Sequence, residues 1–83
     1  MKSKDEVAEW VAGLLVRQFE VRADAIHLDA HLFEDLDLDS IDAIDFMVTL
    51  EEAGGLRVEE EELRGLRRFR DLVELVSGKL EAK

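Results

Sequence analysis

The chain has 83 residues, of which 11 are basic and 21 are acidic, and its formal net charge at pH 7 is −10. A chain of this length forms a thin hydrophobic core, which leaves little room for a deep substrate cavity beside a full set of catalytic groups. It contains no cysteine, which excludes disulfides and thiolate metal sites. We therefore expect a single domain over residues 1–83 that binds, carries or scaffolds and is not an enzyme.

The acidic residues are concentrated in the middle of the chain. No lysine or arginine lies between Arg22 and Arg57, and this interval holds ten acidic residues. The rest of the chain holds 11 acidic and 11 basic residues, so the whole net charge lies in the central segment. Such a field repels nucleic acid and anionic lipid and attracts basic protein surfaces. Charge alone is equally consistent with a surface that only keeps the protein soluble.

The N-terminal residues show no apolar signal segment after Met1. No apolar run reaches the roughly 20 residues that span a membrane. We therefore expect a cytoplasmic protein without a membrane span.

The first predicted helix starts at Ser3 and ends near Phe19. Ser3 and Glu6 have the spacing of a capping box, in which each side chain accepts a hydrogen bond from the backbone of the other. Apolar residues then recur at helical spacing, at Val7, Val11, Leu14 and Leu15. Residues 20–39 lack a regular period and predict a long ordered loop whose apolar side chains reach the core. Such a loop is uncommon inside a compact domain and is often functional.

Three further helices are predicted. The second runs from Ser40 to Ala53 and stops at residues 54–55, which are both glycine. A short third helix covers residues 59–66, where leading glutamates favour a helix N-terminus. The last helix covers residues 69–76 and closes at a Ser-Gly pair, so we expect residues 79–83 to be a frayed tail.

The second predicted helix has apolar residues on two faces. At about 100° per residue, one side is an ordinary core face that contains Ala43, Phe46, Met47, Leu50 and Ala53. The opposite side carries a second stripe with acidic residues among and beside its apolar members: Ile41, Ile44, Val48, Asp45, Glu52 and, at the margin, Asp42. Burial of the helix on both sides would explain this stripe. If it is exposed, its apolar residues supply affinity for a partner, and its acids orient a basic one.

Ser40 lies at the start of this helix, in Asp39-Ser40-Ile41-Asp42. Most serines at helix starts only cap the helix. A helix N-terminus also favours a phosphodiester, because its free N–H groups and its dipole attract anions. The loop before Ser40 and the stripe after it would present such a modification to partner enzymes.

One calcium-binding pattern is incomplete. Asp35, Asp37 and Asp39 have the spacing of the first ligands of an EF-hand loop. Ser40 then stands where the loop requires glycine, and Phe46 stands where it requires a bidentate glutamate. We therefore expect no EF-hand.

A second group, formed by His27, Asp29 and His31, also raises the possibility of a metal site. No further strong ligand is evident nearby, and neither histidine has an evident link to Ser40. We expect no metal site and no self-contained catalysis.

Residues 32–42 resemble the modification site of acyl carrier proteins. They read Leu32-Phe33-Glu34-Asp35-Leu36-Asp37-Leu38-Asp39-Ser40-Ile41-Asp42, whereas the family typically reads Asp-Ser-Leu preceded by Glu-Asp-Leu-Gly. The likeness continues without a gap through Asp45, Glu51-Glu52, Val58, the run 59–62 and the helix over 69–76. It covers essentially the whole chain.

The resemblance implies an all-α four-helix bundle of acyl-carrier type, with a long loop between helices one and two and a short third helix. It implies that a phosphopantetheinyl transferase moves a 4′-phosphopantetheine arm from coenzyme A onto Ser40, and that Asp39 belongs to the transferase recognition motif. The thiol of the arm then holds acyl groups as thioesters. It delivers them to the acyl-transferring and chain-modifying enzymes of fatty acid, lipid or polyketide-type biosynthesis.

The resemblance also assigns docking and pocket residues. The family's partner-docking positions correspond to Ile41, Asp42, Ile44, Asp45, Val48, Glu51 and Glu52, and the helix wheel reaches most of them independently. Candidates for lining an acyl pocket are Phe46, Leu50, Leu66 and Val73. We expect a monomer, because the acidic rim of so short a stripe would repel a copy of itself.

The sequence departs from the family pattern at several positions. Asp37 stands where glycine is common, and aspartate tolerates a positive φ better than most residues. Gly54 and Gly55 replace bulkier residues, and we expect Leu56 and Leu63 to restore core volume. The third-helix region adds a basic patch, made by Arg57, Arg64, Arg67, Arg68 and Arg70. These departures indicate a specialised carrier in a secondary lipid or polyketide-like pathway.

Two alternatives stay open. A non-modified acidic helical interaction module would use the same stripe without a prosthetic group. A peptidyl or aminoacyl carrier would use the same serine for a different cargo.

Overall fold

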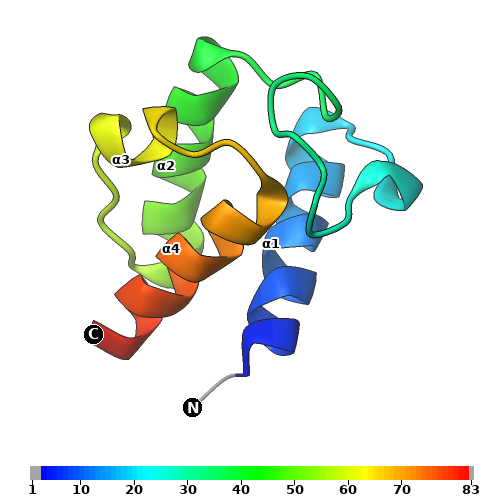
Figure 1. The fold of residues 1–83 in the computed structure, drawn as a ribbon. Helices are drawn as coiled ribbons and strands as arrows, with labels where there is room; N and C mark the ends of the chain where they lie inside the picture. The colour runs from blue at the N-terminus through cyan, green and yellow to red at the C-terminus, as the bar shows by residue number, and fades with distance from the viewer. Residues whose placement is uncertain (1–2, 83) are drawn as a thin grey trace.

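The computed structural model describes residues 3–82. Within that range the chain forms four α-helices and one short 3-10 helix (Figure 1): α1 Lys4–Phe19, η1 Ala23–Ala25, α2 Ser40–Gly54, α3 Glu60–Arg64 and α4 Phe69–Ala82. The described residues contain no β-strand, and their one β-bridge joins His31 to Arg68. The predicted all-α fold, with a long first loop and a short third helix, is confirmed.

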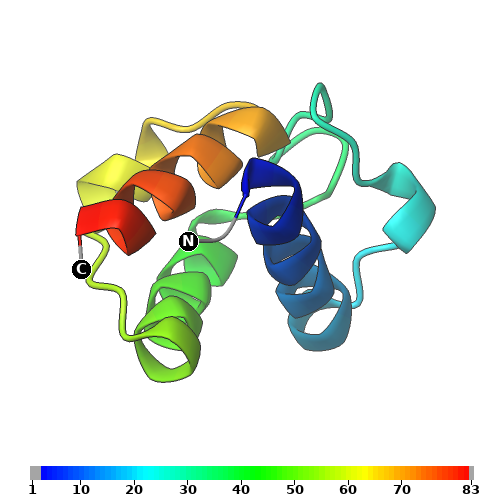
Figure 2. The same ribbon diagram turned by 90° about the horizontal axis from the view of Figure 1, so that it is seen from below.

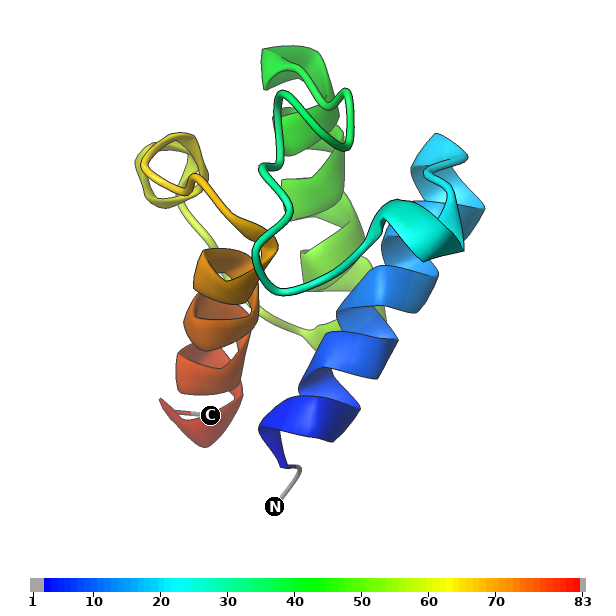
Figure 3. The ribbon, with the colours of Figure 1, turned by 45° about the vertical axis from the view of Figure 1, so that its right-hand side comes forward.

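The three long helices surround a common interior. Helix α1 packs on α4, and α3 packs on α2. Seen from below, α4 lies over the space between α1 and α2 (Figure 2). The long loop crosses the bundle from the end of α1 to the start of α2 (Figure 3). The start of α2 therefore lies at one end of the bundle, where the loop arrives.

The core is apolar and includes part of the long loop. Val11 of α1, Leu50 of α2 and Val76 of α4 are fully buried at its centre. Four loop residues are also buried, namely Val21, Ala30, Leu32 and Leu36. This confirms that the loop sends apolar side chains into the core, and it explains how so long a segment without a regular helix is held in place.

Helix α1 begins as the sequence predicts, with one difference. The Ser3 hydroxyl accepts a hydrogen bond from the backbone N–H of Glu6 at 3.3 Å. The return bond from the Ser3 backbone to the Glu6 side chain does not form within residues 3–82, so half of the predicted capping box is present. The helix ends at Phe19, and Glu20 follows in the left-handed conformation with φ of 57°.

Helices α2 and α3 differ slightly from their predicted bounds. Gly54 belongs to α2, and only Gly55 adopts the left-handed conformation that ends it, with φ of 65°. Helix α3 is shorter than predicted, because Glu59 caps its start and Gly65 follows its last residue, Arg64. Leu56 and Leu63 are both buried, as expected for residues that fill the core near the two glycines.

Helix α4 continues beyond its predicted end. The Ser-Gly pair at 77–78 lies inside the helix, which reaches Ala82. Ser77 is buried, Leu80 packs against the core, and Lys79 forms an ion pair with Glu62 of α3 at 3.0 Å. These contacts hold the last turns, so the prediction of a frayed tail is wrong for residues 79–82. Lys83 lies outside the described residues.

Candidate functional site

The first turn of α2 is capped by two aspartates. Asp39 Oδ1 accepts a hydrogen bond from the backbone N–H of Asp42 at 2.9 Å, and Asp42 Oδ2 accepts one from the backbone N–H of Asp39 at 3.2 Å. This is a reciprocal capping box, and it satisfies two backbone donors of the first turn. The Asp-x-x-Asp spacing is visible in the sequence, but the resemblance indicates only recognition for Asp39 and docking for Asp42.

Ser40 is the first residue of α2, and its side chain is free. The residue is exposed, and its hydroxyl has no hydrogen-bond partner among residues 3–82. Because Asp39 does the capping, the ordinary structural role of a serine at a helix start is already filled. Ser40 is therefore exposed without a capping role.

One of the backbone N–H groups expected to attract an anion at this helix start is already hydrogen-bonded. The Asp39 carboxylate occupies the backbone N–H of Asp42 and brings a negative charge to the first turn. That N–H group is therefore not available to a phosphodiester on Ser40, which leaves only the other N–H groups of the first turn for the interaction expected from the sequence.

The loop before Ser40 is organised by its own hydrogen bonds. The backbone N–H of His31 donates to Asp35 Oδ2 at 2.8 Å, and His31 Nδ1 accepts from the backbone N–H groups of Phe33 and Glu34 at 3.3 and 3.2 Å. Asp37 has φ of 59°, so it occupies the left-handed region, where glycine is common in the family. Aspartate is one of the few other residues that adopt this conformation readily.

One aspartate from each of the two metal-like sequence patterns instead makes a contact within the fold. Asp35 is bound to His31, and Asp29 forms an ion pair with Arg70. Within residues 3–82, no three His, Cys, Asp or Glu side chains converge to hold a metal ion.

The second apolar stripe of α2 is exposed. Ile41, Ile44 and Val48 keep 69 %, 43 % and 50 % of their surface exposed. The acidic residues Asp45, Glu51 and Glu52 are exposed beside them, whereas Asp42 is half-buried by its capping role. Burial of α2 on both sides is therefore excluded within the described chain. The expected core face is buried at Phe46 and Leu50, although Ala53 at its end is exposed.

A small apolar cavity lies behind the start of α2. Its volume is about 30 Å³, enough for one or two water molecules. It is lined by Leu15, Phe19, Leu32, Phe33, Leu38, Asp42, Ala43, Phe46, Leu63, Leu66 and Leu72. Asp42, the one polar residue in this lining, links the cavity to the capped turn that carries Ser40.

The four pocket candidates divide into two pairs. Phe46 and Leu66 line the cavity. Leu50 and Val73 are buried in the core but do not line it. The sequence identified all four as apolar and inward-facing, but it did not place the cavity at the Ser40 end of α2, where the loop residues Leu32 and Phe33 also line it.

A wider groove of about 360 Å³ adjoins the cavity on the side of α1. It shares Phe19, Leu38 and Asp42 with the cavity, and its other residues include Arg22 and Asp35. Its polar lining suits water or a polar group better than an acyl chain.

The arginine-rich region does not form one free basic patch. Arg64 forms an ion pair with Glu60 at 2.8 Å. Arg68 donates to the backbone carbonyl of Asp29 at 2.7 Å, and Arg70 forms an ion pair with the Asp29 carboxylate. Two of the five arginines, Arg64 and Arg70, are therefore neutralised by carboxylates within the fold, and Arg68 is held by a backbone carbonyl.

No helix within residues 3–82 combines the length and the apolar character needed to cross a bilayer.

Comparison with known proteins identifies the family. The phosphopantetheine attachment site family matches residues 9–76. The chain is 35 % identical over 80 residues to acyl carrier protein 2 of Ralstonia nicotianae, covering 96 % of this chain and 99 % of that protein. It is 36 % identical over 78 residues to an acyl carrier protein of Petrotoga mobilis, covering 94 % and 92 % of the two chains. The chain belongs to the acyl carrier protein family.

The fold agrees with this assignment. The crystal structure of an acyl carrier protein from Thermotoga maritima superposes with a TM-score of 0.80 at 26 % identity, over 95 % of this chain and 92 % of that one. Acyl carrier proteins carry a covalently attached 4′-phosphopantetheine and hold acyl groups on it. Their role is to carry and not to catalyse, and they work with a phosphopantetheinyl transferase and with biosynthetic enzymes.

Proposed function

We propose that this acyl carrier protein receives its 4′-phosphopantetheine on Ser40. The observation that carries the proposal is the exposed, unbonded Ser40 hydroxyl on the first turn of α2, where Asp39 and Asp42 have already satisfied the capping requirement. The arm supplies a thiol, which the chain itself lacks. The apolar cavity beside Asp42 lies within the same end of the bundle and offers shelter for the first carbons of a cargo.

Transfer from coenzyme A by a broad-specificity phosphopantetheinyl transferase tests this assignment. We expect intact-protein mass spectrometry to show one added arm on the wild type and none on Ser40→Ala. Ser3→Ala is the matched control, because Ser3 is also an exposed serine at a helix start. Modification of Ser40→Ala would refute the assignment.

We propose that the exposed stripe of α2 is the docking surface for the enzymes that load and unload the arm. Ile41, Ile44 and Val48 supply apolar contact area next to Ser40. Asp45, Glu51 and Glu52 add negative charge, which favours partners with basic surfaces and speeds their approach at low ionic strength. The half-buried Asp42 contributes less of its surface to docking than the other acids do.

We propose that the cargo is an acyl group destined for fatty acid, lipid or polyketide-type biosynthesis. We also propose that the carrier is a cytoplasmic monomer and that residues 1–83 form its single domain. Sedimentation velocity tests the monomer, and a stable dimer would refute it. Selective loading by an aminoacylating adenylation enzyme, with no acceptance from an acyl-activating enzyme, would instead assign a peptidyl or aminoacyl carrier. A folded chain that no transferase modifies would assign the unmodified interaction module.

A further inference from the structure

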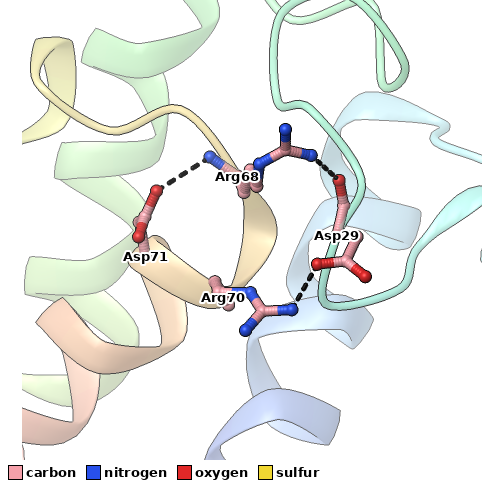
Figure 4. Close-up of polar contacts among 4 residues, drawn as sticks. All are labelled: Asp29, Arg68, Arg70 and Asp71. Atoms are coloured by element: carbon pink, nitrogen blue, oxygen red, sulfur yellow. Dashed lines mark hydrogen bonds and ion pairs between the residues drawn. The ribbon is translucent and has the colours of Figure 1, made fainter.

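The long loop is fastened to the first turn of α4 and to the residue before it by a polar clamp. Arg68 donates to the backbone carbonyl of Asp29 at 2.7 Å, and Arg70 forms an ion pair with the Asp29 carboxylate. Figure 4 shows Asp29 held between the two guanidinium groups, which approach it from the start of α4. We call these three side chains, Asp29, Arg68 and Arg70, the clamp.

Backbone hydrogen bonds run alongside the clamp. The N–H of Leu32 donates to the carbonyl of Arg67 at 2.8 Å, and the N–H of Phe69 donates to the carbonyl of Ala30 at 2.8 Å. The N–H of Arg70 donates to the carbonyl of Leu28 at 3.0 Å. The loop segment 28–32 and the segment 67–70 are therefore joined along their length, and the clamp closes the outer side of this seam.

This seam borders the apolar cavity. Leu32 and Phe33 line the cavity from the loop, while Leu66 and Leu72 line it from either side of segment 67–70. At about 30 Å³ the cavity is too small for an acyl chain, so it must expand to admit one. Expansion between the loop and segment 67–70 requires the seam to open.

The cavity can also expand between α2 and α3. Ala43 and Phe46 of α2 line the cavity, as do Leu63 of α3 and the neighbouring Leu66. The side chains of α2 and α3 that line the cavity are apolar except for Asp42, and α3 is held to α4 by the Glu62–Lys79 ion pair at 3.0 Å. A chain that entered between α2 and α3 would meet the clamped seam as one wall of the cavity.

We propose that the clamp sets the length of acyl chain that this carrier shelters. The inference rests on the proposed carrier function and adds to it a determinant of cargo size. The Asp29 and Arg70 side chains are 68 % and 52 % exposed, so their ion pair shifts the opening of the seam by up to about fivefold. A weakened clamp lets the wall yield, and more methylene groups then enter the protein.

The test uses the full-length protein with saturated acyl groups of increasing chain length attached through the arm. Each methylene group that enters the cavity raises the folding equilibrium constant by roughly fourfold, and methylene groups left in solvent add little. Urea denaturation of each loaded form therefore gives the chain length at which added stability reaches a plateau. Mass spectrometry confirms loading independently of this readout.

Arg70→Gln and Asp29→Asn weaken the clamp without removing side-chain volume. Lys4→Gln is the matched control, because Lys4 and Glu74 form a similarly exposed ion pair between α1 and α4, and neither residue lines the cavity. The stability of each loaded protein is compared with that of the unloaded form of the same variant. A loss of stability caused by the substitution itself is present in both forms and therefore cancels. Amide hydrogen exchange at Leu32 and Phe69 in the unloaded proteins reports opening of the seam directly.

We expect the plateau to move to longer chains in Arg70→Gln and Asp29→Asn, with faster exchange at Leu32 and Phe69. We expect wild type and Lys4→Gln to share a shorter plateau. The same plateau in all four proteins, with loading confirmed, overturns the role of the clamp and leaves the carrier function intact. Failure to load any of them overturns the carrier function and the clamp proposal together.

Discussion

Asp39 and Asp42 cap the first turn of α2 reciprocally, each accepting a hydrogen bond from the backbone N–H of the other. This relationship frees Ser40, which lies between them, from the structural role that a serine at a helix start usually has. It also brings two carboxylates close to the proposed point of attachment. The residue pair thus has a structural role that is separable from recognition by a transferase.

Substitution of Asp39 separates these roles. We expect Asp39→Ala to lower the free energy of unfolding by about 1 kcal/mol, because the N–H of Asp42 loses its acceptor. Asp39→Ser keeps a capping oxygen and should lose only a few tenths of a kcal/mol. Urea denaturation measures both, and equal stability of all three proteins would contradict the capping role. Slow arm transfer to a stable Asp39→Ser would identify the negative charge as the feature that the transferase recognises.

Gly54 is required by the close approach of Trp10. A methyl group at position 54 would lie 2.7 Å from Trp10 Cη2 and 3.3 Å from Leu56 Cγ. We expect Gly54→Ala to destabilise the protein by about 1–3 kcal/mol and to shift the fluorescence of Trp10, the chain's one tryptophan, because the ring must move. Gly78→Ala is the control, because nothing lies within 4 Å of a methyl group there. An unchanged emission spectrum in Gly54→Ala would refute the contact.

The Glu62 carboxylate ties α3 to α4 in a pH-dependent way. The backbone N–H of Glu59 and the Lys79 ammonium both donate to it, and they hold the pKa of Glu62 below its ordinary value of 4.5. Because the folded state lowers this pKa, the stabilisation is complete above pH 4.5 and is lost as the pH falls through the lowered value. It therefore favours the folded state at neutral pH.

Glu62→Gln tests this linkage. We expect the variant to be less stable than wild type at neutral pH, and the difference to shrink toward zero as the pH falls through the lowered pKa of Glu62. Glu61→Gln is the control, because Glu61 is exposed and its side chain has no partner within residues 3–82. Thermal unfolding across the acid range gives the comparison. A difference that persists unchanged in acid would show that the charge of Glu62 is not responsible.

The exposed stripe predicts a loss of function without a loss of stability. Ile44 is 43 % exposed, so Ile44→Ser should change the free energy of unfolding by about 0.5 kcal/mol or less. We expect it to slow arm transfer and acyl transfer, because apolar contact with the enzyme is lost. Leu28→Ser is the matched control, since Leu28 is 51 % exposed and lies outside the stripe. Equal transfer rates for the two variants would argue against docking through α2.

The sequence predicts those features that repeat at short range. The 3.6-residue period places Ile41, Ile44 and Val48 on one face of α2, and all three are exposed as a docking stripe requires. The period identifies the core face of α2, but it does not tell whether the second apolar face is buried as well. The observed exposure of Ile41, Ile44 and Val48 answers that question.

Contacts between distant segments were not predictable in this way. Asp29 and Arg70 are far apart in the chain, and no local pattern indicates that the loop and the start of α4 lie side by side. The Ser-Gly pair at 77–78 looked like a helix end, but tertiary packing of Ser77 and Leu80 extends α4 to Ala82. Here the burial of side chains outweighs the low helix propensity of the Ser-Gly pair, and the local sequence does not show which side chains are buried.

The position of the arm is the most direct test of the account. Trypsin cleaves after Arg22 and Arg57 and at no residue between them, so the peptide 23–57 contains Ser40 as its one serine. After transfer from coenzyme A, we predict that tandem mass spectrometry finds the arm on this peptide, at Ser40, and on no other peptide. An arm on another residue, or no arm on a folded protein beside a control carrier modified in parallel, would contradict the central claim that Ser40 is the attachment site.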